Sequence, residues 1–394
     1  MFATLNRISF DGFRIFFLAA ALYGVLTGVI WGSWLALVGW GVFWDLPGGE
    51  VLPSQWHAHE MIFGYAAAAV GGFFLTAVPS WTGTEAARRG FVLTVAGLWL
   101  LGRVAIWFSA ALPPTLVMVL DQLFIPVLAA KVLAQLLKRP KLPNIAFLVL
   151  LSALWGANLL VHLEWMGLTQ SLDTGLRMGL MALCAMIAVL GGRVTPGFTR
   201  NAMKRDGVDV AQLPASPDWM NKAVLVLALL LPWAVTIRPV FPEFSGALAL
   251  ALAVLQLLRQ RHWGALWTRR QPILWTLHLG MGFLALGLAA WGLAQFGIGA
   301  ELAALHLLGI GGVGGMTVAV MSRASLGHTG RALVAPPPMV AAYALLPLTA
   351  LLRSFADSPM LMLITAGLWT VAFACLFLGI WPALSSPRAE RTAG

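Results

Sequence analysis

The feature that most limits the fold of this chain is a series of long apolar stretches separated by short polar loops. A helix needs about 20 apolar residues to cross the hydrocarbon core of a bilayer, where the backbone must satisfy its own hydrogen bonds. This rule predicts twelve spans, at residues 13–40, 57–79, 90–110, 113–137, 143–163, 172–192, 220–240, 244–260, 272–296, 299–321, 337–355 and 358–381. We therefore expect an all-α, polytopic membrane protein in which residues 1–394 form a single transmembrane domain.

The composition supports this class. Hydrophobic residues make up 60% of the chain and charged residues 10%, whereas a soluble domain carries roughly 25% charged residues. A net charge of +10 would suggest nucleic-acid binding in a soluble protein. Here the basic residues lie in short loops, so we expect contact with the lipid bilayer and no nucleic-acid partner. Cys184 and Cys375 are isolated in apolar stretches, which predicts neither a disulfide nor a thiolate metal site.

The basic residues alternate from loop to loop. Lys and Arg follow the second, fourth, sixth, eighth and tenth spans and mark both termini, whereas the other loops carry Asp and Glu and almost no Lys or Arg. By the positive-inside rule, the basic loops and both termini are cytoplasmic and the other loops face outward. The first apolar stretch is too long for a cleaved signal peptide and has no Ala-x-Ala site, so we interpret it as a retained span.

Polar residues from distant parts of the sequence fall at one predicted depth. At 1.5 Å per residue, for example, His306 lies about 10 Å below the outer start of its span. The residues expected in this outer third of the bilayer are His57, His59, Glu60, Arg103, Asp121, Asn158, His162, Arg177 and His306. Each is unfavourable in hydrocarbon, and a shared cofactor would account for all of them together.

Histidines are the predicted metal ligands. Imidazole suits copper, iron and haem iron, whereas magnesium or calcium would demand more carboxylates. His57, His59 and His306 are the outer candidates, and His278 and His328 form a weaker group on the cytoplasmic side. Structural, hydrogen-bonded histidines are the alternative. Positions two apart on a helix diverge by about 200°, so either His57 precedes the helix or His57 and His59 serve different centres.

Other polar residues would support such a centre. A ligating imidazole needs an acceptor for its second ring nitrogen, and Glu60 is the nearest carboxylate in sequence. We expect Arg103 and Asp121 to form an ion pair, because both lie at a depth of roughly 10 Å. Haem propionates need cations, and Arg103 and Arg177 lie at a suitable depth. We place Asp121, Asn158 and His162 around the ligands, although Arg103 and Asp121 could also be a purely structural pair.

Glycines in two spans offer flat helix faces. Such faces would admit a haem, or they would allow close helix packing of the small-xxx-small kind. The glycines concerned are Gly64, Gly71 and Gly72 in the second span and Gly309, Gly311, Gly312, Gly314 and Gly315 in the tenth.

Three long motifs occur in order along the chain. They are His57-Ala-His-Glu-Met-Ile-Phe-Gly-Tyr with Thr76–Gly83, then Gly191–Asn201, then Met321–Arg331. Together they closely resemble the NnrS family. The resemblance implies a twelve-span bacterial inner-membrane protein that contains haem, which we expect to be b-type, and copper. It also implies a role in denitrification and in defence against nitric oxide, that is, against nitrosative stress. The family's histidine motifs map onto His57, His59, Glu60, His306 and His328.

Two classes of function follow. In the first, a haem–copper centre near the outer face binds or turns over nitric oxide as ligand or substrate, using an electron donor that the sequence does not identify. In the second, the protein is a transporter or a metal- or haem-handling permease, and the histidines form a transit site. The basic Gly-x-x-x-Asp loop of major-facilitator transporters is missing after the second span.

The motifs after spans 2, 6 and 10 recur at four-helix intervals, which invites comparison with the three four-helix arcs of haem–copper oxidases. This comparison is a fold-level analogy. The oxidases' own His-Pro-Glu-Val-Tyr and double-histidine motifs are absent from the sequence.

Overall fold

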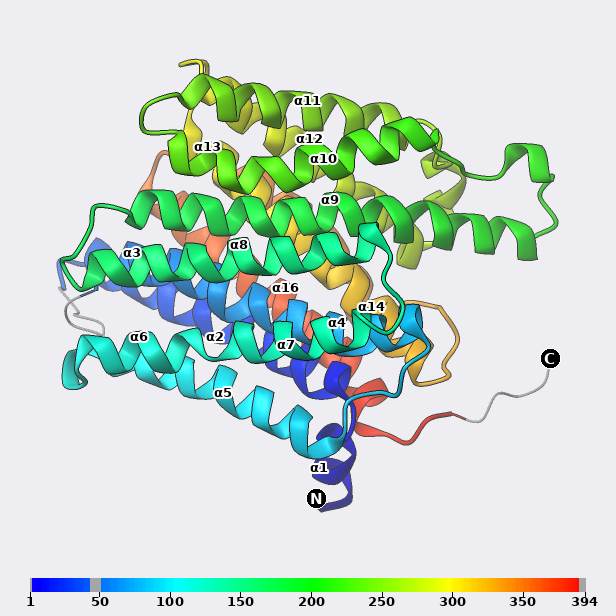
Figure 1. Cartoon of the computed structure of the whole chain (residues 1–394), viewed down its shortest axis with the longest axis horizontal. Coiled ribbons are helices and arrows are strands. Elements are labelled where there is room, and N and C mark those ends of the chain that lie inside the picture. The colour runs from blue at the N-terminus through cyan, green and yellow to red at the C-terminus, as the bar shows by residue number, and fades with distance from the viewer. Residues whose placement is uncertain (1, 43–50, 390–394) are drawn as a thin grey trace.

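The computed structural model describes residues 2–42 and 51–389, and this part of the chain forms helices and no strands (Figure 1). The long helices run roughly side by side along the longest axis of the molecule. Within the described residues, 11 helices are long and apolar enough to cross a membrane. The chain is therefore a polytopic, all-helical membrane protein, as the apolar stretches predict.

The spans are built from one to three helical pieces. The single helices are α2 (Gly12–Gly39), α5 (Arg89–Trp107), α8 (Leu142–Trp165), α9 (Leu172–Arg205), α11 (Pro242–Gln260), α12 (Pro272–Ala294) and α16 (Pro359–Ser385). The composite spans are α3 (Pro53–His59), η1 (Glu60–Ala66) and α4 (Ala67–Thr82); α6 (Pro114–Gln122) and α7 (Phe124–Leu136); α10 (Asp218–Ala234) and η4 (Val235–Ile237); and α13 (Glu301–His306), η6 (Leu307–Gly314) and α14 (Gly315–His328). Shorter elements are α1 (Phe2–Ile8), η2 (Ser109–Ala111), η3 (Val210–Gln212) and η5 (Ala265–Arg270).

The predicted span at 337–355 corresponds to α15 (Pro337–Ser354). This helix is 18 residues long, or about 27 Å at the α-helical rise, which is just under the hydrocarbon thickness of about 30 Å. Its prolines and Arg353 keep it less apolar than the 11 candidate spans. It nevertheless packs in the bundle against α16 and η6.

The first and last long helices close the bundle. α2 packs along α16, and Trp369 Nε1 of α16 donates a hydrogen bond to the Gly24 carbonyl at 2.9 Å. A Cβ at Gly24 would lie 2.5 Å from the Phe373 ring. The absence of a side chain here lets the two backbones approach closely, as is usual for helix pairs in membranes.

Two predicted loops are helical. We expected a loop after residue 192, but α9 continues to Arg205, and His328, expected beyond its span, is the last residue of α14. Residues 193–205 extend α9 by about 20 Å at the helical rise, and its last turns reach past the neighbouring helices on the right of Figure 1. The hydropathy rule ends a span at the first basic residues. A helix ends only where the backbone leaves helical geometry, here just before Gly207, whose φ is 75°.

The bundle has two chemically different ends. α3, α6 and α13 lie at one end, on the left of Figure 1, and α9 and α14 finish at the other. We call the first the outer end, because the loop charges predict that it faces outward, and the second the basic end.

Candidate functional site

His57 and His59 point into different surroundings at the outer end. Both lie in α3, so their side chains diverge by about 200°. The ring of His57 stacks on Trp31 of α2, with ring centroids 4.4 Å apart. His59 is completely buried and faces α6 and α8 instead. The two histidines therefore belong to separate side-chain clusters.

The first cluster, which we call the buried cluster, consists of His59, Asp121 and His162. Nε2 of His162 lies 2.9 Å from Asp121 Oδ2, and Nε2 of His59 lies 3.3 Å from the same oxygen. Among the described residues, these three form a group that could hold a metal ion, with one ligand atom from each and all three atoms within 4.8 Å of one another.

Hydrogen bonds hold the buried cluster in place. Nδ1 of His59 lies 2.9 Å from Glu60 Oε1, and Nε2 lies 2.9 Å from Asn158 Oδ1. The Asn158 amide nitrogen donates to Asp121 Oδ2 at 2.7 Å. Both ring nitrogens of His59 thus face acceptors. A proton on each nitrogen satisfies this arrangement, and so does a proton on Nδ1 with a metal at Nε2.

Arg103 links the buried cluster to a second carboxylate. Its guanidinium pairs with Asp121, as the matched depths predicted, and also donates to Glu60 Oε1 at 2.6 Å. The Tyr23 hydroxyl donates to the other oxygen of Glu60. Two buried carboxylates and one guanidinium leave a net charge of −1. A proton on His59 or a bound cation would neutralise it, which a buried site requires.

Two of the spans that carry histidines change to π-helix directly after a histidine. In one span η1 follows His59, and in the other η6 follows His306. These π-helical segments contact each other. π-Helical turns are rare and often mark functional sites, because the extra residue redirects the side chains around it. The apolar periodicity of the sequence did not predict these π-helical segments.

The second cluster, which we call the stacked cluster, consists of His57, His306, Trp31 and Arg353. His57 Nδ1 is buried and has no hydrogen-bond partner among the described residues. His306 Nδ1 donates to the Leu302 carbonyl at 2.8 Å, so its Nε2 keeps a free lone pair when the ring is neutral. His57, His306 and Arg353 are close enough to interact electrostatically.

Gly309, one helical turn after His306, borders an open space. A Cβ at Gly309 would meet no atom within 4 Å, whereas a Cβ at Gly311 would lie 2.4 Å from the Phe283 ring. Gly312, Gly314 and Gly315 likewise face neighbouring helices. Close packing therefore accounts for four of the five glycines in this span, and Gly309 leaves room beside His306.

Arg177 lies in a different group of charges. Its guanidinium donates to both oxygens of Glu301, at 2.8 and 2.7 Å, and pairs with Asp173 at 3.0 Å. Arg238 shares Glu301 at 3.0 Å. Partial burial and the nearby Arg177 lower the pKa of Arg238 from its ordinary value. In the described structure, Arg103 and Arg177 thus belong to separate ion-pair groups.

The histidines near the basic end have separate environments. His278 Nε2 lies 2.9 Å from the Thr199 hydroxyl, and its Nδ1 is buried without a partner among the described residues. His328 is exposed at the end of α14, and its ring packs on Phe13 at 5.4 Å. His278 thus contacts α9 and His328 contacts α2, and no described contact joins the two.

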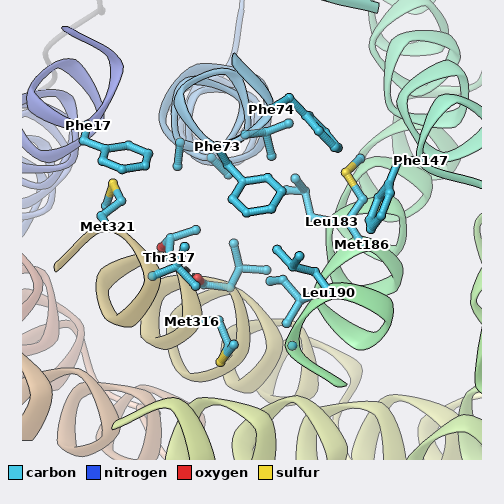
Figure 2. A pocket seen from close by; sticks show the side chains of 17 residues that line it. Phe17, Phe73, Phe74, Phe147, Leu183, Met186, Leu190, Met316, Thr317 and Met321 are labelled. Atoms are coloured by element: carbon cyan, nitrogen blue, oxygen red, sulfur yellow. Dashed lines mark hydrogen bonds between the residues drawn. The ribbon is translucent and has the colours of Figure 1, made fainter. Parts of the chain in front are cut away.

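An apolar cavity of about 60 Å³ lies in the middle of the bundle, inward of the two π-helical segments. Figure 2 shows Phe and Met side chains from several helices converging on it. Of the residues that line it, only Thr317 carries a polar side chain, and its hydroxyl is bonded to Tyr65. The cavity has room for a few water-sized molecules and is far too small for a macrocycle.

Sequence reasoning missed two members of these clusters. Trp31 looks like any other apolar residue of its span, and only its ring contact with His57 distinguishes it. Arg353, close to the outer end of a predicted span, meets the same depth criterion as Arg177 and could have been found by it.

Comparison with known proteins identifies the family. The family model described as NnrS protein matches residues 8–388, nearly the whole chain. No curated protein matches the sequence. The matched range includes both histidine clusters, the two π-helical segments and the central cavity. The chain therefore belongs to the NnrS family, which indicates a membrane protein of the nitric oxide response.

Proposed function

We propose that the chain is a haem- and copper-binding protein of the bacterial inner membrane that binds or turns over nitric oxide near its outer end. The observation that carries the proposal is the divergence of His57 and His59 into two separate histidine clusters. We assign the haem to the stacked cluster and the copper to the buried cluster.

The stacked cluster fits a haem. A ligating imidazole is neutral and usually donates its second ring nitrogen to a carbonyl or carboxylate, and His306 makes such a bond to Leu302. His57 offers a buried ring nitrogen with no hydrogen-bond partner in the described structure. Gly309 leaves space beside His306. Arg353, which forms no ion pair with a carboxylate of the described residues, would serve a propionate.

The buried cluster fits copper. His59, His162 and Asp121 provide imidazole and carboxylate ligands, and imidazole is a preferred ligand of copper. Glu60 accepts from His59 Nδ1 and so directs Nε2 of that ring toward the site. The bound ion would also supply the positive charge that Glu60, Asp121 and Arg103 lack together. When bound, the two metals would supply ligand binding and electron transfer to nitric oxide.

The central cavity supports nitric oxide as the ligand. A small apolar cavity in a protein stays free of ordered water and takes up small apolar molecules. The walls here are almost entirely apolar, and nitric oxide is a small, weakly polar diatomic. Tyr65, in the π-helical segment after His59, is hydrogen-bonded to Thr317 at the wall of the cavity.

The test uses metal and haem analysis of four purified single variants, His57→Ala, His306→Ala, His59→Ala and His162→Ala. We expect loss of haem with copper retained when His57 or His306 is replaced. We expect loss of copper with haem retained when His59 or His162 is replaced. His262→Ala is the control, because His262 is exposed and outside both clusters.

Two outcomes would reject the proposal. Full haem and copper in all four variants would remove both clusters from consideration and direct attention to His278 and His328. A wild-type protein without a Soret band would favour the second class of function, a transporter or a metal- or haem-handling permease. The buried charges of the outer end would then line a transit path.

A further inference from the structure

A broad cleft opens between α9, α10 and α11 near the basic end of the bundle. Its volume is about 580 Å³, which lies within the usual range of small-molecule sites. Its charged lining residues are Arg193, Arg200, Lys222, Arg259 and Asp218. Four cations and one carboxylate give the cleft a net charge of +3. None of these side chains belongs to the buried cluster, the stacked cluster or the central cavity.

Arg259 is the buried member of this group. It is only 2% exposed, and its guanidinium donates to the Ala188 carbonyl at 2.9 Å, to Gln256 Oε1 at 2.5 Å and to Asn221 Oδ1 at 3.2 Å. All three acceptors are neutral. No carboxylate of the described residues pairs with Arg259, and its Nε is buried without a partner. A buried cation in this position lacks a counter-charge.

The backbone of α9 makes room for this guanidinium. A Cβ at Gly192 would lie 2.3 Å from Nη2 of Arg259, so a larger residue here would displace the guanidinium from its present position. The ring of Trp263 lies against the other side, 5.3 Å from the guanidinium carbon. Arg259 is therefore fixed in a slot at the wall of the cleft, which is how a preorganised anion site is built.

The other cations are also oriented. Arg200 Nε donates to the Pro214 carbonyl at 2.8 Å, and Arg193 Nη1 donates to Asn144 Oδ1 at 3.0 Å. Lys222 and Asp218 are both exposed at the rim of the cleft. Asp218 is the one carboxylate among the lining residues, and its negative charge would repel a bound anion. Arginines present planar donor pairs that match the oxygens of a phosphate group. Basic pockets between helices at this side of a membrane also bind lipid head groups.

We propose that this cleft binds a phosphate group, with Arg259 as its buried counter-charge and Arg193, Arg200 and Lys222 around its oxygens. The phosphate can belong to an anionic phospholipid of the surrounding leaflet or to free inorganic phosphate. Both sources present the same chemistry to the cleft. The inference is independent of the haem and copper sites, because it uses other residues at the opposite end of the bundle.

The test uses the full-length protein in two arms. In the first, protein in neutral detergent is titrated with inorganic phosphate at constant ionic strength, and binding is measured by calorimetry. In the second, protein in nanodiscs of phosphatidylcholine, with or without phosphatidylglycerol, is released into the mass spectrometer and its retained lipids are counted. Free phosphate as ligand gives a signal in the first arm alone. A lipid as ligand gives selective retention of phosphatidylglycerol in the second.

The matched variants are Arg193→Gln with Lys222→Gln, which alters two exposed lining residues, and Arg269→Gln with Arg270→Gln, which alters two exposed arginines outside the cleft. We expect at least tenfold weaker phosphate binding, or loss of the retained lipid, in the first pair alone. Equal weakening in both pairs would mean unspecific attraction to a basic surface and would overturn the proposal. The absence of both phosphate binding and selective lipid retention in the wild type would also overturn it.

Discussion

Arg103 is the residue on which the buried charges of the outer end depend. It is the only arginine or lysine in the described structure that contacts both Glu60 and Asp121, and the side chains of these carboxylates are completely buried. Removing one partner of a buried pair leaves the other charge without compensation, which is far more costly than never burying the pair. We therefore expect the stability of the protein to depend on Arg103.

We expect the losses of stability caused by replacing Arg103 and Asp121 to be non-additive. Arg103→Ala alone and Asp121→Ala alone should each destabilise the protein by about 3 to 5 kcal/mol or prevent its accumulation. Losing both should be milder than the sum, because Glu60 can then pair with a protonated His59. Thermal unfolding of the three variants in the same detergent is the measurement. Additive losses would show that the two side chains do not interact.

At the scale of single elements, the two π-helical segments decide where the histidines point. η1 and η6 each begin one residue after a cluster histidine and run toward the central cavity. A regular helix through the same residues would rotate everything beyond the histidines by the equivalent of one residue. The glycines of η6 then determine how closely α12 and α15 approach.

Two glycines of η6 should differ in their response to the same substitution. Gly311→Ala puts a methyl group 2.4 Å from the Phe283 ring and should cost about 1 to 3 kcal/mol through overpacking. Gly309→Ala, facing open space, should leave stability unchanged within about 0.5 kcal/mol. Thermal unfolding of the purified variants without added ligand checks this. Equal destabilisation by both changes would contradict the packing described for η6.

At the scale of the whole molecule, the distribution of charge sets the orientation. The basic end carries the loops rich in Lys and Arg, and the outer end carries both histidine clusters. Positive loops stay on the cytoplasmic side during insertion. The two histidine clusters would then face the opposite side, and the basic cleft would face the cytoplasm.

This orientation can be tested with reporter fusions. A reporter attached after Arg331 should report a cytoplasmic location, and one attached after Gly297, in the loop between α12 and α13, should report an outward location. Moving basic residues out of the loops should weaken this difference. Activity of the Arg331 fusion on the outward side would reverse the assignment of both ends.

Much of the architecture could be predicted from contiguous segments of sequence. Apolar length predicted where the spans lie, and matched depth predicted the pairing of Arg103 with Asp121, which the structure confirms. The continuation of α9 to Arg205 was missed, because hydropathy marks where hydrocarbon contact ends and not where a helix ends. The π-helical segments were missed as well, since the apolar pattern of the sequence gives no sign of the extra residue in a π-helical turn.

What the sequence by itself determined is the class of the protein and the depth of its polar residues, because hydropathy and loop charge are properties of local stretches. Only the tertiary structure decided which polar residues meet. His59 finds Asn158 across 99 positions of sequence, whereas His57, two residues before it, stacks on Trp31 of another helix. The direction of a side chain around its helix, and the identity of the helix it faces, arise from packing, so they could be read only from the folded bundle.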